Sequence, residues 1–421
     1  MELMKGYKQT EIGVIPDEWK LMTIDQIFEF HSTSNYSKAE MLPEGEIGCF
    51  HYGLIHSLPN NNYDIRTGVK YFITKQQAKY EFIRDGDVVM VDASEDLSGV
   101  NKSIEISDVE DKLFISGLHT YLLRDRGFFE KYFRGPILNA YFTKAQFYRL
   151  AVGMKVYGVS KQQLKTVLLP IPAKSEQVAI AKVLSDADAY INSLEKLIEK
   201  KRQIKQGAMQ GLLKPKDGWE VKKLGDLGTC LRGVSYNPER DLYSFDEFNT
   251  VRLLRSNNIQ NSKIDLNGLQ FVDKLRVKRH QIIQDNDIII CMANGSKQLV
   301  GKAAKFKKNG NLDYTYGAFM GCFRTDANLA DSSFVYYNFL TNQYRNYIDV
   351  LLSGSSINNL NPKNIESIEI CLPRIEVQKE ISETLLNFDL EIDFLNEKIE
   401  KAKSIKQGMM QNLLTGKIRL I

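Results

Sequence analysis

The chain has 421 residues and a mass of 48.2 kDa, with 43% apolar and 26% charged residues. This composition excludes the disordered, collagenous and fibrous classes, and the length accommodates two or three domains. A formal net charge of +4, from 56 Lys and Arg against 52 Asp and Glu, is too small to indicate a nucleic-acid partner by itself.

The cysteines and the hydropathy bear on the compartment. The five cysteines are widely spaced and form no CxxC pair, which favours neither a disulfide framework nor a zinc site and fits a reducing compartment. No stretch approaches the roughly 18 apolar residues of a membrane helix, and the N-terminus lacks the apolar core of a secretory signal. We therefore expect a cytoplasmic protein without a membrane partner.

One unit is written twice along the chain. The segment KQGAMQGLL at 205–213 returns as KQGMMQNLL at 406–414, with seven identities in nine positions, and such self-similarity identifies a repeat. Four further pairs match in the same order: DEWKLMTIDQI with DGWEVKKLGDL, RDGDVV with QDNDII, SGLHTYLLR with YGAFMGCFR, and LPIPAKSEQ with CLPRIEVQ. We divide the chain into an N-terminal tail (1–16), a first globular domain (17–172), a central helix (173–214), a second globular domain (215–373) and a C-terminal helix and tail (374–421).

Both globular domains alternate short β-rich runs with Gly, Asn and Asp. The runs GDVVMVDAS, HTYLLR and TVLLPIP in the first domain and NDIIICMANGS, FMGCFR and SIEICLP in the second predict strands. Near the end of the first domain, Ser160 and Gln163 have the spacing of a capping box. In the second domain, Asn361 before Pro362 predicts a helix cap with proline at the first helical position. The predicted fold class is α+β.

The two long helices carry the same heptad pattern. Of ten successive a and d positions, eight are apolar between Ile180 and Leu212, and nine between Ile381 and Leu413. A heptad pattern sustained over more than four repeats predicts a coiled coil. The alternative is that each helix packs only on its own globular domain as a surface helix.

The connection between the copies favours antiparallel packing of the helices. Only the KPKDG segment separates the first helix from the second domain, and domain termini usually lie close together. The second helix should therefore begin near the end of the first, which predicts an antiparallel coiled coil with approximate twofold symmetry between the domains. A helix of about 39 residues rises roughly 58 Å, about the length of 17 base pairs.

We expect no catalytic site in this chain. The nearest match to a phosphate-binding loop, GSKQLVGKA from Gly295, has the wrong spacing and an alanine where a hydroxyl belongs. The segment around Glu18 and Lys20 lacks a partnered carboxylate for a nuclease, and a solvated strand edge beside a packed tryptophan explains it better. The five histidines are not at metal or triad spacings.

A basic run in the second domain is a candidate DNA contact. No acidic residue lies between Asp287 and Asp313, where the sequence places Lys297, Lys302, Lys305, Lys307 and Lys308. Ammonium groups neutralise phosphates, and the neighbouring Asn294, Ser296 and Gln298 carry groups that read base edges. The alternative is a solvated lysine-rich loop. The equivalent segment of the first domain, which holds Ser94, Asn101 and Lys102, contains several acidic residues.

Loops after the first strands of each copy supply the other candidates. Their side chains differ where the framework repeats, as diverged specificity would produce, although ordinary loop drift gives the same pattern. The candidates in the first copy are Tyr36, Lys38, His51, Tyr52, Lys155 and Tyr157. Those in the second copy are Arg232, Tyr236, Arg255, Asn257, Asn258, Ser355, Ser356 and Asn358.

Several motifs together resemble a known family. The opening YKQTEIGVIPDEW, the LPIP and CLP strands before a long helix, the KQGxMQxLL helix ends and the final TGKIRL resemble specificity subunits of type I restriction-modification systems. The resemblance covers nearly the whole chain. It implies two target-recognition domains separated by two helices that form an antiparallel coiled coil.

The resemblance also implies function and partners. Each recognition domain would read one half of a split double-stranded DNA target, and the helices would dock two methyltransferase subunits, through which restriction subunits join. S-adenosylmethionine, ATP and Mg²⁺ would then belong to the partner subunits, and this chain would hold no cofactor and no metal. Two alternatives stay open: a non-catalytic protein-binding scaffold with two heads spaced by a coiled coil, and a self-sufficient methylase or nuclease.

Overall fold

The computed structural model describes residues 5–77, 79–308, 310–353 and 358–420. The chain divides into two compact units: unit 1 contains residues 1–196 and 396–421, and unit 2 contains residues 197–395. Each unit mixes helices and sheets, so the predicted α+β class is confirmed. Among the described residues, none of the helices combines the length and hydropathy needed to cross a bilayer.

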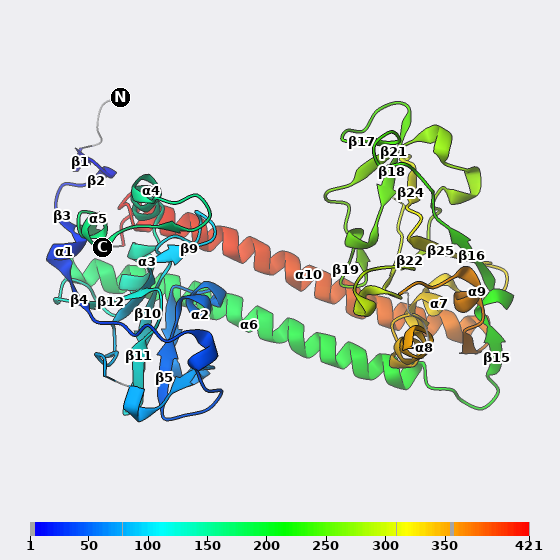
Figure 1. Ribbon diagram of the computed structural model, residues 1–421, viewed down its shortest axis with the longest axis horizontal. Helices are drawn as coiled ribbons and strands as arrows, with labels where there is room; N and C mark the ends of the chain where they lie inside the picture. The colour runs from blue at the N-terminus through cyan, green and yellow to red at the C-terminus, as the bar shows by residue number, and fades with distance from the viewer. Residues whose placement is uncertain (1–4, 78, 309, 354–357, 421) are drawn as a thin grey trace. The chain divides into compact units, whose positions relative to one another are not determined.

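Unit 1 is built on a five-stranded and a three-stranded sheet (Figure 1). The five-stranded sheet has the order β4 (Phe28–His31), β12 (Thr120–Asp125), β8 (Val88–Val91), β10 (Ser103–Ser107) and β6 (Asn62–Asp64). The three-stranded sheet has the order β11 (Leu113–Ser116), β5 (Ile47–Phe50) and β7 (Phe72–Ile73). Three two-stranded pairs complete it: β1 (Tyr7–Thr10) with β2 (Gly13–Pro16), β3 (Lys20–Thr23) with β14 (Leu168–Ile171), and β9 (Ala93–Ser94) with β13 (Tyr157–Gly158). The short helices are α1 (Ile24–Ile27), α2 (Tyr52–Ser57), α3 (Arg134–Leu138), α4 (Tyr141–Leu150) and α5 (Lys161–Lys165).

Unit 2 repeats this plan with two four-stranded sheets. One has the order β16 (Gly228–Arg232), β25 (Met320–Thr325), β22 (Ile288–Cys291) and β23 (Ala303–Lys305). The other has the order β17 (Leu242–Tyr243), β21 (Gln270–Asp273), β18 (Thr250–Leu254) and β24 (Tyr314–Tyr316). Two pairs remain: β15 (Glu220–Lys223) with β26 (Glu369–Leu372), and β19 (Ile259–Gln260) with β20 (Lys263–Ile264). Its short helices are α7 (Ser332–Asn338), α8 (Asn342–Ser353) and α9 (Pro362–Glu366).

The long helices lie where the heptads predict them, at α6 (Lys174–Leu212) and α10 (Ile375–Leu413). Both predicted caps at the preceding short helices are also present. Ser160 and Gln163 form a reciprocal capping box at α5, and Asn361 caps α9, with Pro362 at the first helical position. These local signals are short-range hydrogen-bonding patterns, which is why the sequence alone reveals them.

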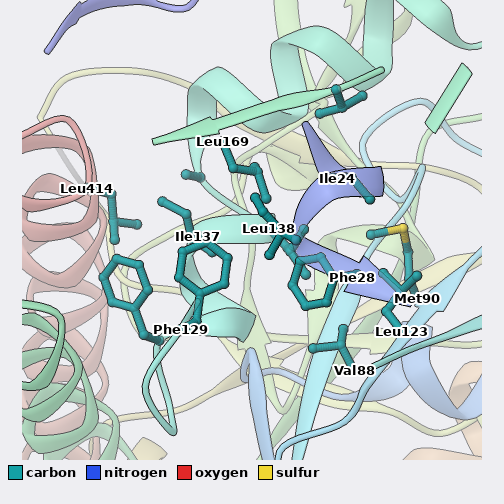
Figure 2. Close-up of a cluster of buried hydrophobic side chains, with 14 of the residues drawn as sticks. Ile24, Phe28, Val88, Met90, Leu123, Phe129, Ile137, Leu138, Leu169 and Leu414 are labelled. Atoms are coloured by element: carbon teal, nitrogen blue, oxygen red, sulfur yellow. The ribbon is translucent and has the colours of Figure 1, made fainter. Parts of the chain in front are cut away.

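The largest core of unit 1 joins the five-stranded sheet to the long helices. Figure 2 shows Phe28, Val88 and Leu123 from the strands directed toward Leu138 of α3. Leu414, which follows α10, belongs to the same buried cluster. Burial of such side chains stabilises the fold by about 1.5–3 kcal/mol each, so the end of α10 is an integral part of unit 1.

Stretches of the two long helices also run antiparallel within each unit. In unit 1, Lys406 of α10 pairs with Asp188 of α6. In unit 2, Lys205 of α6 pairs with Asp389 of α10, with 2.5 Å between Nζ and Oδ1. Lys205 and Lys406 occupy equivalent positions of the two heptad patterns, where a lysine replaces the apolar residue that a coiled-coil seam usually has. Their aspartate partners lie on the opposite helix, which explains how a lysine is tolerated on a partly buried seam.

A buried ion pair recurs at the same place in both units. In unit 1, Arg124 donates to both carboxylate oxygens of Asp87 at 2.9 and 2.7 Å. In unit 2, Arg324 donates to both oxygens of Asp287 at 2.9 and 2.6 Å. Each aspartate is only 2% exposed. This two-pronged geometry is the strong form of the charge-assisted hydrogen bond, and it joins neighbouring strands of the main sheet.

A buried glutamine fastens the first turn of each long helix to its unit. The Gln177 side chain accepts from the Glu130 amide at 2.8 Å and donates to the Pro172 carbonyl at 3.0 Å. Gln378 accepts from the Asp331 amide at 2.9 Å and donates to the Pro373 carbonyl at 2.7 Å. Since both glutamines are fully buried, they orient the two helices in the same way relative to the adjoining sheets.

Candidate nucleic-acid interface

In unit 2, loops from separate strands meet around a pocket of about 800 Å³. The loops follow β16, β18 and β22, and they are joined by the β24–β25 connection and by the segment before α9. Five of the predicted DNA contacts lie here: Tyr236, Arg255, Asn257, Asn294 and Asn358. The structure therefore brings together residues that the sequence spreads over more than 120 positions.

Hydrogen bonds within the pocket engage the side chains of Asn294 and Asn358. Asn294 donates to Ser256 Oγ at 3.3 Å, and its side-chain oxygen accepts from the Ser296 amide at 3.0 Å. Asn358 donates to the Gly295 carbonyl at 3.3 Å. These bonds tie the loop after β22 to the loop after β18 and to the segment before α9, so the rim has a defined shape.

Asn258 lies beneath this rim instead of on it. Its side chain is 1% exposed and donates to the carbonyls of Asp265 and Asn267 at 2.9 and 3.2 Å. Its side-chain oxygen accepts from the Arg255 amide at 3.0 Å. In this structure Asn258 therefore positions the backbone of Arg255, and it has no surface to offer a base.

The basic run of unit 2 separates into inward and outward lysines. Lys302 donates to the Ile259 carbonyl at 3.1 Å, and Lys305 donates to Ser333 Oγ at 2.6 Å. Burial lowers the pKa of Lys305. Lys297 and Gln298 are exposed, as is Ser296. The outward group remains available to a phosphate, whereas Lys302 and Lys305 are engaged inside the unit.

Three predicted contacts in unit 2 remain: Arg232, Ser355 and Ser356. Arg232 is exposed at the end of β16, and its carbonyl accepts from Gln281 at 3.1 Å. Ser355 and Ser356 lie outside the described residues.

Unit 1 has a pocket of about 620 Å³ beside its own strand ends. Three predicted contacts line it: Tyr52, Ser94 and Lys102. Its wall also contains Glu95 and Asp96, two carboxylates without counterparts in the pocket of unit 2. Lys102 donates to the carbonyls of His56, at 3.0 Å, and of Leu58, and burial lowers its pKa.

Tyr52 is the centre of a group of aromatic rings. It is 39% exposed, and its ring centre lies 5.9 Å from that of His51, 6.3 Å from that of His56 and 5.5 Å from that of His119. His119 Nδ1 lies 3.2 Å from Asp92 Oδ1. Burial raises the pKa of Asp92, and His119 partly offsets this effect. This surface combines imidazole and carboxylate groups, whereas the pocket of unit 2 combines amides and a guanidinium.

Three predicted contacts of unit 1 have buried side chains. Asn101 is fully buried, donates to the Val91 carbonyl at 3.2 Å and has a φ of +50°. Asparagine tolerates this left-handed conformation better than most residues. Ser94 accepts from the Asp96 amide at 3.3 Å. His51 accepts from the Gly53 amide at 3.1 Å, and burial, with Lys38 nearby, lowers its pKa. All three therefore shape loops in this structure.

The remaining candidates of unit 1 lie around this surface. Tyr36 donates to the Gln77 carbonyl at 3.4 Å, and Lys38 lies 5.5 Å from the ring centre of Tyr71. Tyr157 pairs with Ser94 in the β9–β13 ladder, and Lys155 is exposed just before it. These four residues do not line the pocket itself.

Sequence reasoning missed the residues of the β11–β12 and β24–β25 connections. Phe319 lines the pocket of unit 2 with 71% of its surface exposed. Its carbonyl accepts from the amides of Met292 and Ala293 at 2.9 and 3.1 Å, which fixes the loop. The equivalent residue in unit 1 is His119. The signal was the change from His119 to Phe319 inside two otherwise matching segments, SGLHTYLLR and YGAFMGCFR.

No group of three or more His, Cys, Asp or Glu residues is arranged to hold a metal ion within the part of the chain that the structure describes.

Comparisons with known proteins converge on one family. The family described as "Type I restriction modification DNA specificity domain" matches residues 16–206 and again residues 216–404. The EcoKI specificity subunit of Escherichia coli is 34% identical over 48% of this chain and 43% of its own length, so that match spans less than half of the relative. A Methanocaldococcus jannaschii sequence, provisionally named the type I restriction enzyme MjaX specificity subunit, is 26% identical over 99% of this chain and 97% of its own length.

A solved structure has the same fold over almost the whole chain. The S subunit of a type I restriction-modification system from M. genitalium aligns with a TM-score of 0.55 and 16% sequence identity, over 98% of both chains. At this identity, the match is a likeness of fold.

Proposed function

The chain belongs to the family of type I restriction-modification DNA specificity subunits, and from that premise we propose that it selects a two-part DNA target, one half with each unit. The observation that carries this proposal is the pairing of one repeated framework with two different rims. The Arg–Asp pairs and the helix-fastening glutamines recur, whereas His51 and Tyr52 stand where unit 2 has Arg255 and Ser256.

Two rims of unlike chemistry suit two unlike half-sites. Amides, guanidinium groups and carboxylates each pair with a different set of base edges in the major groove. The exposed Lys297 and Lys155 add positive charge beside the rims, where phosphate contacts would hold each unit in register.

The long helices are the basis for a proposal about how the two units are arranged on the DNA. We propose that α6 and α10 form one antiparallel coiled coil, which relates the two units by an approximate twofold axis and sets the spacing between the half-sites. The supporting observation is that Lys205–Asp389 and Lys406–Asp188 exchange places when the two copies are interchanged.

The same helices are the proposed docking surface for two methyltransferase subunits. Isoleucines stand at equivalent positions of the repeat, Ile204 in unit 2 and Ile405 in unit 1, and are 43% and 52% exposed. Tyr190 and Leu390 add further exposed apolar surface, and apolar patches of this kind are typical of protein interfaces. Restriction subunits would join through the methyltransferase subunits, and S-adenosylmethionine, ATP and Mg²⁺ would belong to those partners.

Selection of bound DNA from a random library tests the proposal. The full chain, alone or with its methyltransferase subunits, is expected to select a sequence with two defined blocks and an unread spacer. Lengthening that spacer by one base pair should abolish binding. Indifference to the spacer would contradict the fixed geometry, and affinity independent of salt would favour a protein-binding scaffold, because phosphate contacts release counterions.

A further inference from the structure

Of the described residues that line the pocket of unit 2, Arg255 is the one with a charged side chain. The other lining residues are neutral, and they include Tyr236, Asn294, Asn358 and the exposed Phe319. Among the residues that the structure describes, no carboxylate forms an ion pair with Arg255. The pocket therefore has one unneutralised cation among amides and aromatic rings.

The guanidinium of Arg255 is also short of acceptors. Its Nε is buried, and no acceptor within the described residues receives it. A buried donor without a partner costs about 1–3 kcal/mol, so an acceptor supplied from outside the unit would be favourable here. Two neighbouring amides are engaged, since Asn294 donates to Ser256 and Asn358 donates to Gly295, whereas the guanidinium of Arg255 keeps unfilled hydrogen-bonding capacity.

The backbone of Arg255 is held firmly in place. Its amide donates to the Asn258 side chain at 3.0 Å, and its carbonyl accepts from the Asn258 amide at 2.9 Å. Asn258 is in turn anchored on the carbonyls of Asp265 and Asn267. A fixed backbone limits the positions of the guanidinium, as selective recognition of one ligand requires.

The chemistry of the pocket favours a base edge over a phosphate. A guanidinium presents parallel N–H groups, which match the adjacent O6 and N7 acceptors of guanine in the major groove. Amide and aromatic walls suit a flat, uncharged ring system, and the exposed Lys297 outside the pocket is available for a phosphate. We infer that Arg255 reads a guanine in the half-site of unit 2, with Asn258 as its positioning residue; this inference rests on the proposed function.

Unit 1 does not offer the same contact. The strand ladders place His51 at the position of Arg255, since Phe50 pairs with Ser116 as Leu254 pairs with Tyr316. His51 is 5% exposed, and its Nδ1 already accepts from the Gly53 amide. The guanine contact is therefore a property of one half-site only.

The test compares the bases selected by four full-length proteins, each in complex with the methyltransferase subunits, from a random-sequence DNA library. The natural chain should select guanine at one position of one half-site. Arg255→Ala should lower that preference roughly 10- to 100-fold and leave the other half-site unchanged. Arg255→Gln, which keeps a polar side chain and so guards against misfolding of the loop, should move the preference toward adenine.

Arg374→Ala is the matched control. Arg374 is exposed just before α10 and does not line the pocket, and its loss should change base choice at no position. Equal weakening of all sequences by Arg255→Ala, with guanine still selected, would overturn the inference and indicate a phosphate contact. Failure of the natural chain to select any sequence would instead contradict the proposed function, so the two failures are distinguishable.

Discussion

The two units share their scaffold and differ at their strand ends. The order β4-β12-β8-β10 in unit 1 matches β16-β25-β22-β23 in unit 2, and the same Arg–Asp pair and helix-fastening glutamine recur. At the rims, however, unit 1 presents Tyr52, His119 and carboxylates, while unit 2 presents Arg255, Phe319 and amides. The Arg–Asp pair and the glutamine, which hold strands and helices together, are shared by the two units, whereas the groups at the two pockets differ.

The contacts of the first turns of α6 and α10 also differ between the units. In unit 1, the buried Glu176 accepts from Trp19 Nε1 at 2.9 Å and pairs with Arg419 of the C-terminal tail. Unit 2 has Val377 at the position of Glu176, and Trp219 packs against Phe334 instead, with ring centres 6.2 Å apart. Glu176 thus ties the segment after α10 to unit 1, whereas an aromatic contact stands at the equivalent place in unit 2.

Breaking the shared ion pair should have the largest effect. Arg324→Ala leaves Asp287 buried without its partner, which should lower the free energy of unfolding of unit 2 by about 3–5 kcal/mol. Arg124→Ala should act similarly on unit 1. The two tryptophans report the units separately, because Trp19 lies in unit 1 and Trp219 in unit 2. Denaturant unfolding followed by fluorescence, in Trp219→Phe or Trp19→Phe backgrounds, measures each effect. A loss below about 1 kcal/mol would contradict a structural role for the pair.

Replacing the interhelical aspartates should lower the free energy of unfolding of the two units by different amounts, both smaller than the loss from breaking the Arg–Asp pair. Asp389 accepts from Lys205 at 2.5 Å and also from the Tyr337 hydroxyl at 2.9 Å. The repeat places Pro136 where unit 2 has Tyr337. Asp389→Ala should therefore cost about 2–3 kcal/mol in unit 2, and Asp188→Ala about 1–2 kcal/mol in unit 1. In a Tyr337→Phe background the difference should vanish, and its persistence there would assign it to another contact.

A pH-dependent difference is expected from Lys144 and its counterpart Arg345. Both donate at 2.7 Å to an equivalent carbonyl, that of Val100 or Val300. Burial, with a contribution from Lys102, lowers the pKa of Lys144 to about 8. From about pH 8 to about 10.4, the ordinary lysine value, the unfolded chain keeps this proton while the folded chain has lost it. Raising the pH in this window should therefore stabilise unit 1, by up to about 1.4 kcal/mol per pH unit.

The variant Lys144→Met isolates that contribution. Unfolding followed by Trp19 fluorescence at several values between pH 7 and 10 gives the slope of the unfolding free energy against pH for each protein. The difference between the two slopes cancels the contribution of groups that titrate in both proteins. The slope of the natural protein should exceed that of the variant above about pH 8, and the two should be parallel below it. Parallel slopes across the whole range would mean that Lys144 titrates as an ordinary lysine.

The exposed aromatic of unit 2 should have the smallest effect on stability. Phe319→Ala should change the free energy of unfolding by less than about 0.5 kcal/mol, because the side chain is largely in solvent. If the rim contacts DNA, the same variant should weaken binding several-fold. His119→Ala is the matched change in unit 1. Titration of labelled target DNA compares them, and unchanged affinity in Phe319→Ala would remove this residue from the interface.

The sequence predicted the repeated framework better than the rims. Heptads and capping residues act over a few positions, and so α6, α10 and the caps at Ser160 and Asn361 were found. The Arg–Asp pairs join motifs that the repeat exposed, although their contact is visible only in three dimensions. The sequence could not predict that Lys102, Lys302 and Lys305 point inward. Each ammonium group donates to a carbonyl or hydroxyl of a residue that is distant in sequence. The burial of Asn101 and Asn258 has the same origin.

A chain that carries the second globular domain twice tests the proposed function most directly. Residues 17–172 are replaced with residues 217–373, so that both positions carry the rim of unit 2, and bound DNA is selected from a random library with the methyltransferase subunits present. The account predicts a symmetric target, in which the half-site of unit 2 occurs twice as an inverted repeat. Selection of the original two-part sequence, or of one half-site alone, would contradict it.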